Sequence, residues 1–354
     1  MRASARIAFI VPGALNQRTG GYIYDRRMVE GLRAAGRPVE VIELPGRFPL
    51  SDSQAEEAAE RALALCIDQH LLPVIDGLAL PAFATLSGLN RLRWVALVHH
   101  PLALETGLSG DEAGALASLE RTALAKSARV IVTSPHTIDD VVDMGVPRLR
   151  ITAVPPGTDP APLAAGLQAE GAPQKLLCVA TITPRKGHVT LIEALSGLRS
   201  RPWTLDLVGA PDRDPACLAE LEAAIARYEM ADRVHFCGEL DGDDLQAAYE
   251  AADLFVLASH HEGYGMALAE ALARGLPVVS TRAGAIPTTV PADAGLLVPP
   301  GDVDALRKAL ASVLDDPDQY RELKSGARAA RGRLPGWDEA LARFVGVLDR
   351  VDGR

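Results

Sequence analysis

The chain has 354 residues, of which 48% are hydrophobic and 23% charged, so it is long enough to bury two ordinary cores. Its formal net charge of -10 argues against a protein that binds nucleic acid by neutralising phosphates, and no nucleic-acid partner is expected. The four cysteines are scattered with no CxxC pair, which argues against a zinc site or a disulfide framework and favours a reducing, cytoplasmic setting.

The apolar segments are too short to cross a membrane. A spanning helix needs about 20 apolar residues, and no stretch approaches that length. The first apolar run is interrupted by Pro12, which is typical of a buried strand rather than of a signal peptide. We therefore expect a soluble protein, with membrane association absent or peripheral.

Short apolar runs rich in Val, Ile and Leu alternate with longer amphipathic segments. Continuous apolar runs indicate strands that are buried on both faces, as in a parallel sheet covered by helices. The expected strands are 7–12, 38–44, 73–80, 94–100, 128–134, 175–181, 203–209, 233–239, 252–259 and 276–281. The clearest expected helices are Tyr22–Ala35, Asp111–Ser127, Pro215–Met230, Met266–Arg274 and Trp337–Val351. This order predicts a doubly wound α/β architecture, with ligands at the carboxyl ends of the strands.

A change in composition divides the chain. Residues 155–173 are rich in Pro, Gly and Ala and lack strand character, which indicates a linker. We expect an N-terminal Rossmann-like domain over 1–160 and a second over 161–335. The last helix follows the breaker pair Pro335–Gly336, so residues 336–354 are expected to pack back on the N-terminal domain.

In the N-terminal half, two pairs of residues stand at the ends of expected strands. Gly20 and Gly21 follow the first strand and open a helix, where glycines let a ligand approach the backbone. His99 and His100 end the fourth strand, just before Pro101. A plain helix-entry turn and a structural histidine remain the alternatives for these two pairs.

In the C-terminal half, Arg185 and Lys186 follow the strand 175–181, where two adjacent cations are well placed to neutralise a diphosphate. Glu262 and Glu270 lie in the segment 260–277, on either side of a glycine-rich turn that opens a helix. A helix N-terminus preceded by glycines favours a phosphate or sugar phosphate. Glu262 could accept hydrogen bonds from sugar hydroxyls, and Glu270, about two helical turns later, could reach a more distant diol.

The run EGYGMALAEALARGLPVV resembles the EX7E signature of family 4 glycosyltransferases, which have the GT-B fold of two Rossmann-like domains facing a cleft. The resemblance implies that Glu262 holds the hydroxyls of the donor sugar and that Glu270 holds the nucleotide ribose. It assigns acceptor binding to the N-terminal domain and nucleotide-sugar binding to the C-terminal one. The donor-binding residues that it implies are Gly20, Gly21, Arg185, Lys186, Glu239, Leu240, Glu262, Gly263, Tyr264, Gly265, Met266, Ala267 and Glu270.

The same resemblance implies a catalytic set and an acceptor site. The catalytic residues are His99, Arg185, Lys186 and Glu262. His99 is favoured over His100 as the histidine that faces the donor, because it continues the register of the strand. His100 and Glu105 are expected to contact the acceptor.

The implied activity is that of a retaining hexosyltransferase (class 2.4.1), which moves a hexosyl group from a nucleoside diphosphate sugar to an acceptor. No cofactor or metal is expected, because cations in the site replace the ion. Three Asp-x-Asp patterns, at 212–214, 241–243 and 302–304, all precede helices and fit capping acids better than metal ligands.

The acceptor and several alternatives stay open. Arg26, Arg27 and Arg33 on the first helix suggest a basic membrane-docking face, but Asp25 and Glu30 dilute its charge, so a soluble small acceptor is favoured over a lipid-linked one or a polysaccharide. A GT-B epimerase, a phosphorolytic enzyme and a silent sugar-nucleotide-binding module are the other candidates. The sequence does not predict the donor sugar, the base or the oligomeric state.

Overall fold

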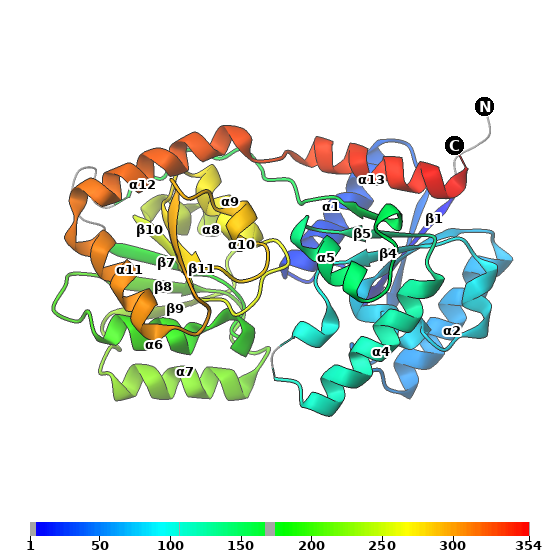
Figure 1. The fold of residues 1–354 in the computed structure, drawn as a ribbon, viewed down its shortest axis with the longest axis horizontal. Coiled ribbons are helices and arrows are strands. Elements are labelled where there is room, and N and C mark those ends of the chain that lie inside the picture. The colour runs from blue at the N-terminus through cyan, green and yellow to red at the C-terminus, as the bar shows by residue number, and fades with distance from the viewer. Residues whose placement is uncertain (1–4, 106, 167–173, 354) are drawn as a thin grey trace. The chain divides into compact units, whose positions relative to one another are not determined.

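The structure, a computed structural model, describes residues 5–105, 107–166 and 174–353. The chain forms two compact units, one of Met1–Gly157 with Pro335–Arg354 and one of Thr158–Leu334. Each unit contains a six-stranded sheet flanked by helices (Figure 1). Every strand pairing among the described residues is parallel, which confirms the predicted doubly wound α/β architecture.

The sheet of the first unit has the strand order β2-β1-β3-β4-β5-β6. Its strands are β1 (Ile7–Pro12), β2 (Val39–Leu44), β3 (Leu72–Asp76), β4 (Val95–Val98), β5 (Arg129–Val132) and β6 (Ile151–Ala153). Its longer helices are α1 (Gly20–Ala34), α2 (Ser53–Asp68), α4 (Gly110–Lys126), α5 (His136–Asp143) and α13 (Trp337–Asp352). A short helix, α3 (Leu80–Phe83), precedes β4.

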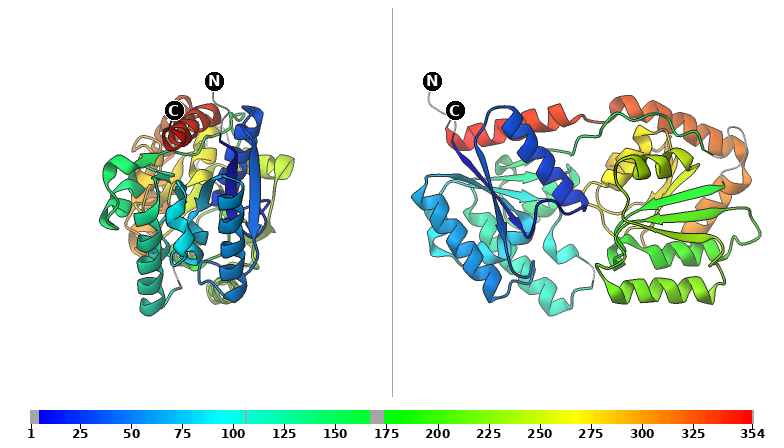
Figure 2. Two further views of the ribbon diagram at one scale, coloured as in Figure 1. Left: turned by 90° about the vertical axis from the view of Figure 1, so that its right-hand side faces the viewer. Right: turned by 180° about the vertical axis from the view of Figure 1, so that it is seen from behind.

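Side chains alternate between two cores on opposite faces of this sheet, as the pleat of a strand requires. Along β1, Ala8 and Ile10 join the core formed with α2, α3, α4 and α5, whereas Ile7 and Phe9 join the core formed with α1 and α13. Phe344 of α13 stacks on Phe9 with ring centroids 6.3 Å apart. The last helix therefore completes the core of the first unit (Figure 2).

The sheet of the second unit has the order β12-β11-β10-β7-β8-β9. Its strands are β7 (Lys175–Val179), β8 (Thr204–Val208), β9 (Val234–Gly238), β10 (Leu254–Leu257), β11 (Val278–Thr281) and β12 (Gly295–Val298). Its helices are α6 (His188–Ser196), α7 (Pro215–Arg227), α8 (Gly242–Ala251), α9 (Met266–Ala273), α10 (Ile286–Thr289), α11 (Val303–Asp315) and α12 (Pro317–Ala330).

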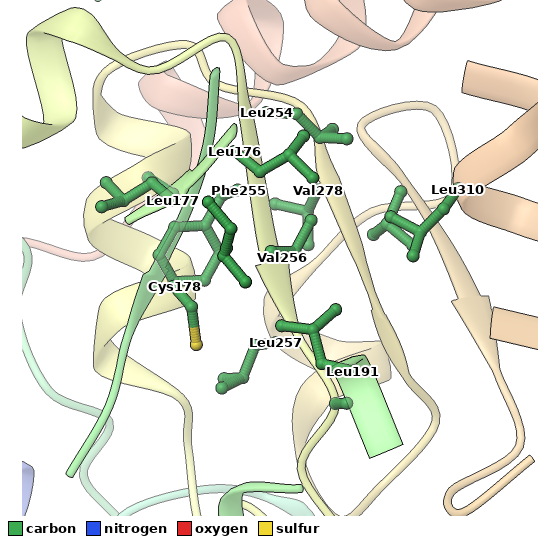
Figure 3. Packing of buried hydrophobic residues seen from close by; sticks show 14 of the residues in the cluster. Leu176, Leu177, Cys178, Leu191, Leu254, Phe255, Val256, Leu257, Val278 and Leu310 are labelled. Carbon is green, nitrogen blue, oxygen red and sulfur yellow. The ribbon is translucent and has the colours of Figure 1, made fainter. Parts of the chain in front are cut away.

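The central strands of the second unit are buried on both faces. Figure 3 shows side chains of β7 and β10 packed together with Val278 of β11, Leu191 of α6 and Leu310 of α11. Leu176 and Phe255 are fully buried in this cluster. Burial on both faces explains the unbroken apolar runs of these strands.

The strand predictions fail at three places. β6 and β12 were not predicted, because both are short strands at the edge of a sheet and lack a long apolar run. The expected strand 73–80 ends at Asp76, since the Asp76 side chain accepts a hydrogen bond from Leu78 N and starts a 3₁₀ turn.

Part of the predicted linker 155–173 lies outside the described residues.

Among the described helices, none is long and apolar enough to cross a bilayer.

Candidate functional site

In the sheet of the second unit, the order in which strands are added reverses between the neighbouring strands β7 and β10. From β7 the chain adds β8 and β9 on one side, and from β10 it adds β11 and β12 on the other. In open α/β sheets the carboxyl ends of the two strands at such a switch point form the usual ligand site. Arg185, Lys186 and Glu262 all lie in the loops that follow these two strands.

The cationic turn after β7 is fixed against the end of β10. Gly187 has φ +66°, and a Cβ at this position would lie 2.1 Å from the Ala258 carbonyl oxygen. His260 N donates to Arg185 O at 2.7 Å, and Arg185 Nη1 donates to His261 O at 2.9 Å. Only glycine fits at position 187, and its close approach holds both cations beside the loop that carries Glu262.

Glu262 is a buried carboxylate in contact with both cations. Its side chain is 7% exposed, and Oε1 accepts from Lys186 Nζ at 2.6 Å and from Ser259 Oγ at 2.7 Å. Arg185 Nη1 lies 3.8 Å from Oε2. Burial alone would raise the pKa of Glu262, but Lys186 and Arg185 outweigh it and lower the pKa to about 2. Glu262 is therefore ionised at neutral pH.

A third loop, which follows β11, contacts the backbone of Glu262. Ala285 N donates to Glu262 O at 2.9 Å, and a Cβ on Gly284 would lie 2.2 Å from the same oxygen. Gly284 has φ +56°, a conformation that favours glycine. The backbone of Glu262 is thus held by the loops of adjacent strands.

Glu270 lies on α9, which begins after Gly265 in the left-handed conformation with φ +87°. Tyr249 of α8 donates its hydroxyl hydrogen to Glu270 Oε2 at 2.9 Å. The Arg274 guanidinium lies 4.3 Å from the centre of the Tyr249 ring, and Arg274 Nη1 donates to Glu270 O at 3.0 Å. α8 therefore sets the direction in which the Glu270 carboxylate points.

The other predicted donor residues of this unit lie in two places. Gly263 and Tyr264 lie in the loop before α9. Met266 and Ala267 are the first two residues of α9. Glu239 and Leu240 follow β9, at the edge of the sheet.

In the first unit, His99 follows β4 and contacts two buried carboxylates. His99 Nε2 lies 3.1 Å from Asp25 Oδ1 of α1 and 3.2 Å from Asp76 Oδ2 at the end of β3. A Cβ on Gly21 would lie 3.2 Å from Cδ2 of the same ring. The structure therefore pairs Gly21 with His99, and α1 begins at Gly20 rather than at Tyr22.

The expected acceptor residues His100 and Glu105 contact each other. His100 Nε2 lies 3.1 Å from Glu105 Oε2. The segment between them is anchored by Glu120 of α4, which accepts a hydrogen bond from Leu102 N at 3.0 Å. Burial raises the pKa of Glu120 to about 7, although the bond from Leu102 lowers it.

Two of the Asp-x-Asp patterns provide helix caps. Asp214 accepts from Cys217 N at 3.0 Å and begins α7, and Asp302 accepts from Ala305 N at 2.9 Å and begins α11. Asp241 occupies the N-cap position of α8 without a side-chain cap bond. Among the described residues, acids and a histidine come close together in the first unit instead. They are Asp25, Asp76 and His99, whose carboxylate oxygens and ring nitrogen lie within 4.8 Å of one another.

Both halves of the chain match glycosyltransferase families. Residues 162–330 match "Glycosyl transferases group 1", and residues 26–157 match "Glycosyl transferase 4-like domain". A D-inositol 3-phosphate glycosyltransferase of Xylanimonas cellulosilytica is 33% identical over 286 residues, which are 74% of this chain and 68% of that protein. The chain belongs to the group 1 glycosyltransferases.

Further comparisons agree with this assignment. An MMP alpha-(1->4)-mannosyltransferase of Mycolicibacterium hassiacum is 28% identical over 73% of this glycosyltransferase and 66% of that protein. The solved sucrose-phosphate synthase of Thermosynechococcus elongatus is similar in fold, with a TM-score of 0.82 over 98% of this chain and 99% of that chain, at 24% identity. The predicted family 4 membership and GT-B fold are confirmed.

Sequence reasoning missed four residues that contact the predicted site residues of this glycosyltransferase, two in each unit. Asp76 interrupts the apolar run 73–80 and Ser259 ends the expected strand 252–259, so both positions carried a usable signal. The other two, Asp25 and Tyr249, lie within helices and contact their partners only through the fold. Asp25 was interpreted as a surface charge on the first helix, which is wrong, since it is 1% exposed.

Proposed function

We propose that this glycosyltransferase moves a hexosyl group from a nucleoside diphosphate sugar to an acceptor hydroxyl, with retention at the anomeric carbon. The observation that carries the proposal is the buried, ionised Glu262 held between Lys186 and Arg185 at the switch point of the second unit. A diphosphate needs cations, and a sugar needs a hydrogen-bond acceptor close beside them.

The contacts suggest how these groups act together. The Lys186 ammonium and the Arg185 guanidinium neutralise the departing diphosphate, whose charge grows as the glycosidic bond breaks. One such donor, fixed in advance, supplies about 10²–10³ in rate. As the cations turn toward phosphate oxygens, the Glu262 carboxylate becomes an acceptor for sugar hydroxyls. In this proposal a phosphate oxygen of the leaving group takes the acceptor proton on the same face.

Glu270 is assigned to the nucleotide part of the donor. Its carboxylate is oriented by the Tyr249 hydroxyl, which suits a bidentate contact with the two hydroxyls of a ribose. We propose Gly263, Tyr264 and the first residues of α9 as neighbours of the donor, with Glu239 and Leu240 beside the base.

No metal or other cofactor is part of this proposal. The charge of a diphosphate is met by Arg185 and Lys186, and the acids of the Asp-x-Asp patterns at 214 and 302 are engaged as helix caps. We further propose that the enzyme works in the cytoplasm, since all four cysteines are free thiols, as expected in a reducing compartment.

The acceptor is proposed to be a soluble small molecule. This is supported by the relative named for D-inositol 3-phosphate. On α1, Arg27 lies over the Trp337 ring and Arg33 donates to Val39 O, so two of the arginines expected to face a membrane are engaged within the first unit. Cosedimentation with vesicles that contain phosphatidylserine should show weak binding, and strong salt-sensitive binding would favour a lipid-linked acceptor.

A turnover assay tests the proposal. The enzyme is incubated with UDP-glucose, GDP-mannose or ADP-glucose, with and without inositol phosphate, and products are followed by mass spectrometry and by the anomeric proton coupling. Release of one nucleoside diphosphate with an α-linked product supports the proposal. A β-linked product would refute retention. An epimerised sugar nucleotide, or binding without turnover, would favour the epimerase or the silent binding module.

A further inference from the structure

The imidazole of His99 is contacted by groups from two elements of the first unit, and a third element holds its backbone carbonyl. Asp25 and the Tyr24 ring come from α1, with the ring edge-on to the imidazole at 5.5 Å between centroids. Asp76 comes from the end of β3. Thr133, after β5, donates its hydroxyl hydrogen to His99 O at 3.0 Å. Both carboxylates contact Nε2, and neither contact uses Nδ1.

Two residues of helix α1 face the His99 ring. Gly21 and Asp25 are four residues apart and therefore lie on the same face of the helix. A Cβ on Gly21 would lie 3.2 Å from Cδ2 of the imidazole, closer than nearly all Cβ contacts, so glycine leaves room for the ring. One turn later, Asp25 reaches Nε2. α1 thus supplies both the space for the ring and a carboxylate for its nitrogen.

We propose that Asp25 is a positioning residue that, together with Asp76, holds His99 as an imidazolium, so that the ring donates a hydrogen bond through Nδ1 and does not serve as a proton acceptor. Two carboxylate oxygens beside one nitrogen require a proton on that nitrogen, since otherwise three acceptors would face one another. Two carboxylates within 3.2 Å of this part-buried ring also favour its charged form, in which Nδ1 carries the second proton.

The electrostatics of the buried cluster agree with this geometry. Burial on its own lowers the pKa of His99, but the charges and hydrogen bonds of Asp25 and Asp76 outweigh it and raise the pKa to about 10. Burial and the neighbouring Asp76 raise the pKa of Asp25 to about 7, against the opposite effect of His99.

This inference rests on the proposed assignment of His99 to the donor, but its first test is independent of any donor. The protein is labelled with ¹⁵N at histidine, the His99 signal is assigned with His99→Asn, and its pKa is measured by NMR titration. In the wild type we expect His99 to remain protonated well above pH 8. In Asp25→Asn the pKa should fall by ~1–3 units, the usual effect of removing an opposite charge at this distance.

Glu30→Gln is the matched control, because it removes a carboxylate from the exposed face of the same helix and should leave the His99 titration unchanged. If Asp25→Asn does not fold, as judged by circular dichroism, the wild-type titration decides by itself. A wild-type His99 that titrates near its ordinary value of about 6.5 would overturn the proposal, as would an unchanged pKa in folded Asp25→Asn. Stoichiometric Zn²⁺ binding that Asp25→Asn abolishes would also overturn it, because a metal ion would replace the proton on Nε2.

The second test links the cation to turnover of UDP-glucose, GDP-mannose or ADP-glucose. The titratable groups around His99 are Asp25, Asp76 and Tyr24. In Asp25→Asn the alkaline limb of the kcat/KM profile should move to lower pH by the same amount as the His99 pKa, and a limb that does not move would contradict the role in donor binding. If none of the three donors is turned over, the proposed function fails while the NMR result still stands.

Discussion

Lys186 Nζ lies 2.6 Å from Glu262 Oε1, although the two residues are 76 positions apart in the chain. This contact joins the loops after β7 and β10, and it pairs the group proposed to hold the diphosphate with the group proposed to hold the sugar. Because Ser259 also donates to Oε1, the carboxylate keeps a hydrogen-bond donor when Lys186 turns toward phosphate. In the absence of a donor, the two groups that are proposed to bind it therefore contact each other.

Replacing Lys186 with Ala should reduce kcat/KM for the nucleotide sugar by about 10²-fold or more, since a cation that stabilises the leaving group is lost. The Lys308→Ala variant removes an exposed lysine of α11 and serves as the control, with activity unchanged. Steady-state kinetics on both variants measure the effect. Normal activity in folded Lys186→Ala would remove the diphosphate assignment.

Glu262 should make stability depend on pH. Its pKa in the folded protein is about 2, below the ordinary value of 4.5, so its contribution is fully present above pH 4.5 and is lost as the pH falls from 4.5 toward 2. The shift corresponds to on the order of 3 kcal/mol. Urea unfolding of the wild type and Glu262→Gln should show a stability difference that shrinks across this range. A difference that stays constant with pH would contradict the buried ion pairs.

Tyr249→Phe should weaken nucleoside diphosphate binding about 3–10-fold, because the hydrogen bond that orients Glu270 is removed. Tyr320→Phe is a suitable control, since it removes the hydroxyl of another buried tyrosine that donates only to a backbone carbonyl, that of Asp253. Calorimetric titration with UDP, GDP and ADP compares the two. Equal affinities in Tyr249→Phe and the wild type would show that α8 does not position Glu270.

Removal of divalent ions should leave activity intact. In the proposed mechanism, Arg185 and Lys186 supply the positive charge that a metal provides in other sugar-nucleotide enzymes. Initial rates are compared before and after dialysis against EDTA. Complete loss of activity that manganese restores would instead require a metal site.

The fold follows from the sequence wherever strands are buried on both faces. β7 and β10 were predicted because their apolar runs are unbroken, as central parallel strands require. The edge strands β6 and β12 carry weaker runs and were missed. The edge strands β2 and β9 carry longer runs and were predicted, so the local pattern fails only at the shorter edge strands.

The site could be predicted only in part. Arg185, Lys186 and Glu262 stand in loops at strand ends, and the structure brings them within contact of one another. Asp25 and Tyr249 lie within helices, where a polar residue carries no local sign of what it contacts. Their partners, His99 after β4 and Glu270 of α9, are brought to them by the tertiary structure and not by any pattern along the chain.

The binding of nucleoside diphosphate to Glu262→Gln and Glu270→Gln tests the central claim most directly, because the two carboxylates are assigned to different parts of one donor. In calorimetric titrations with UDP, GDP and ADP, we expect one of the three to bind the wild type. Glu270→Gln should weaken that binding by about 1–3 kcal/mol. Glu262→Gln should bind the nucleotide as well as the wild type or more tightly, since it removes a negative charge that faces Lys186 and Arg185, yet it should transfer sugar poorly. No binding of any of the three, or an equal loss of affinity in both variants, would contradict the account.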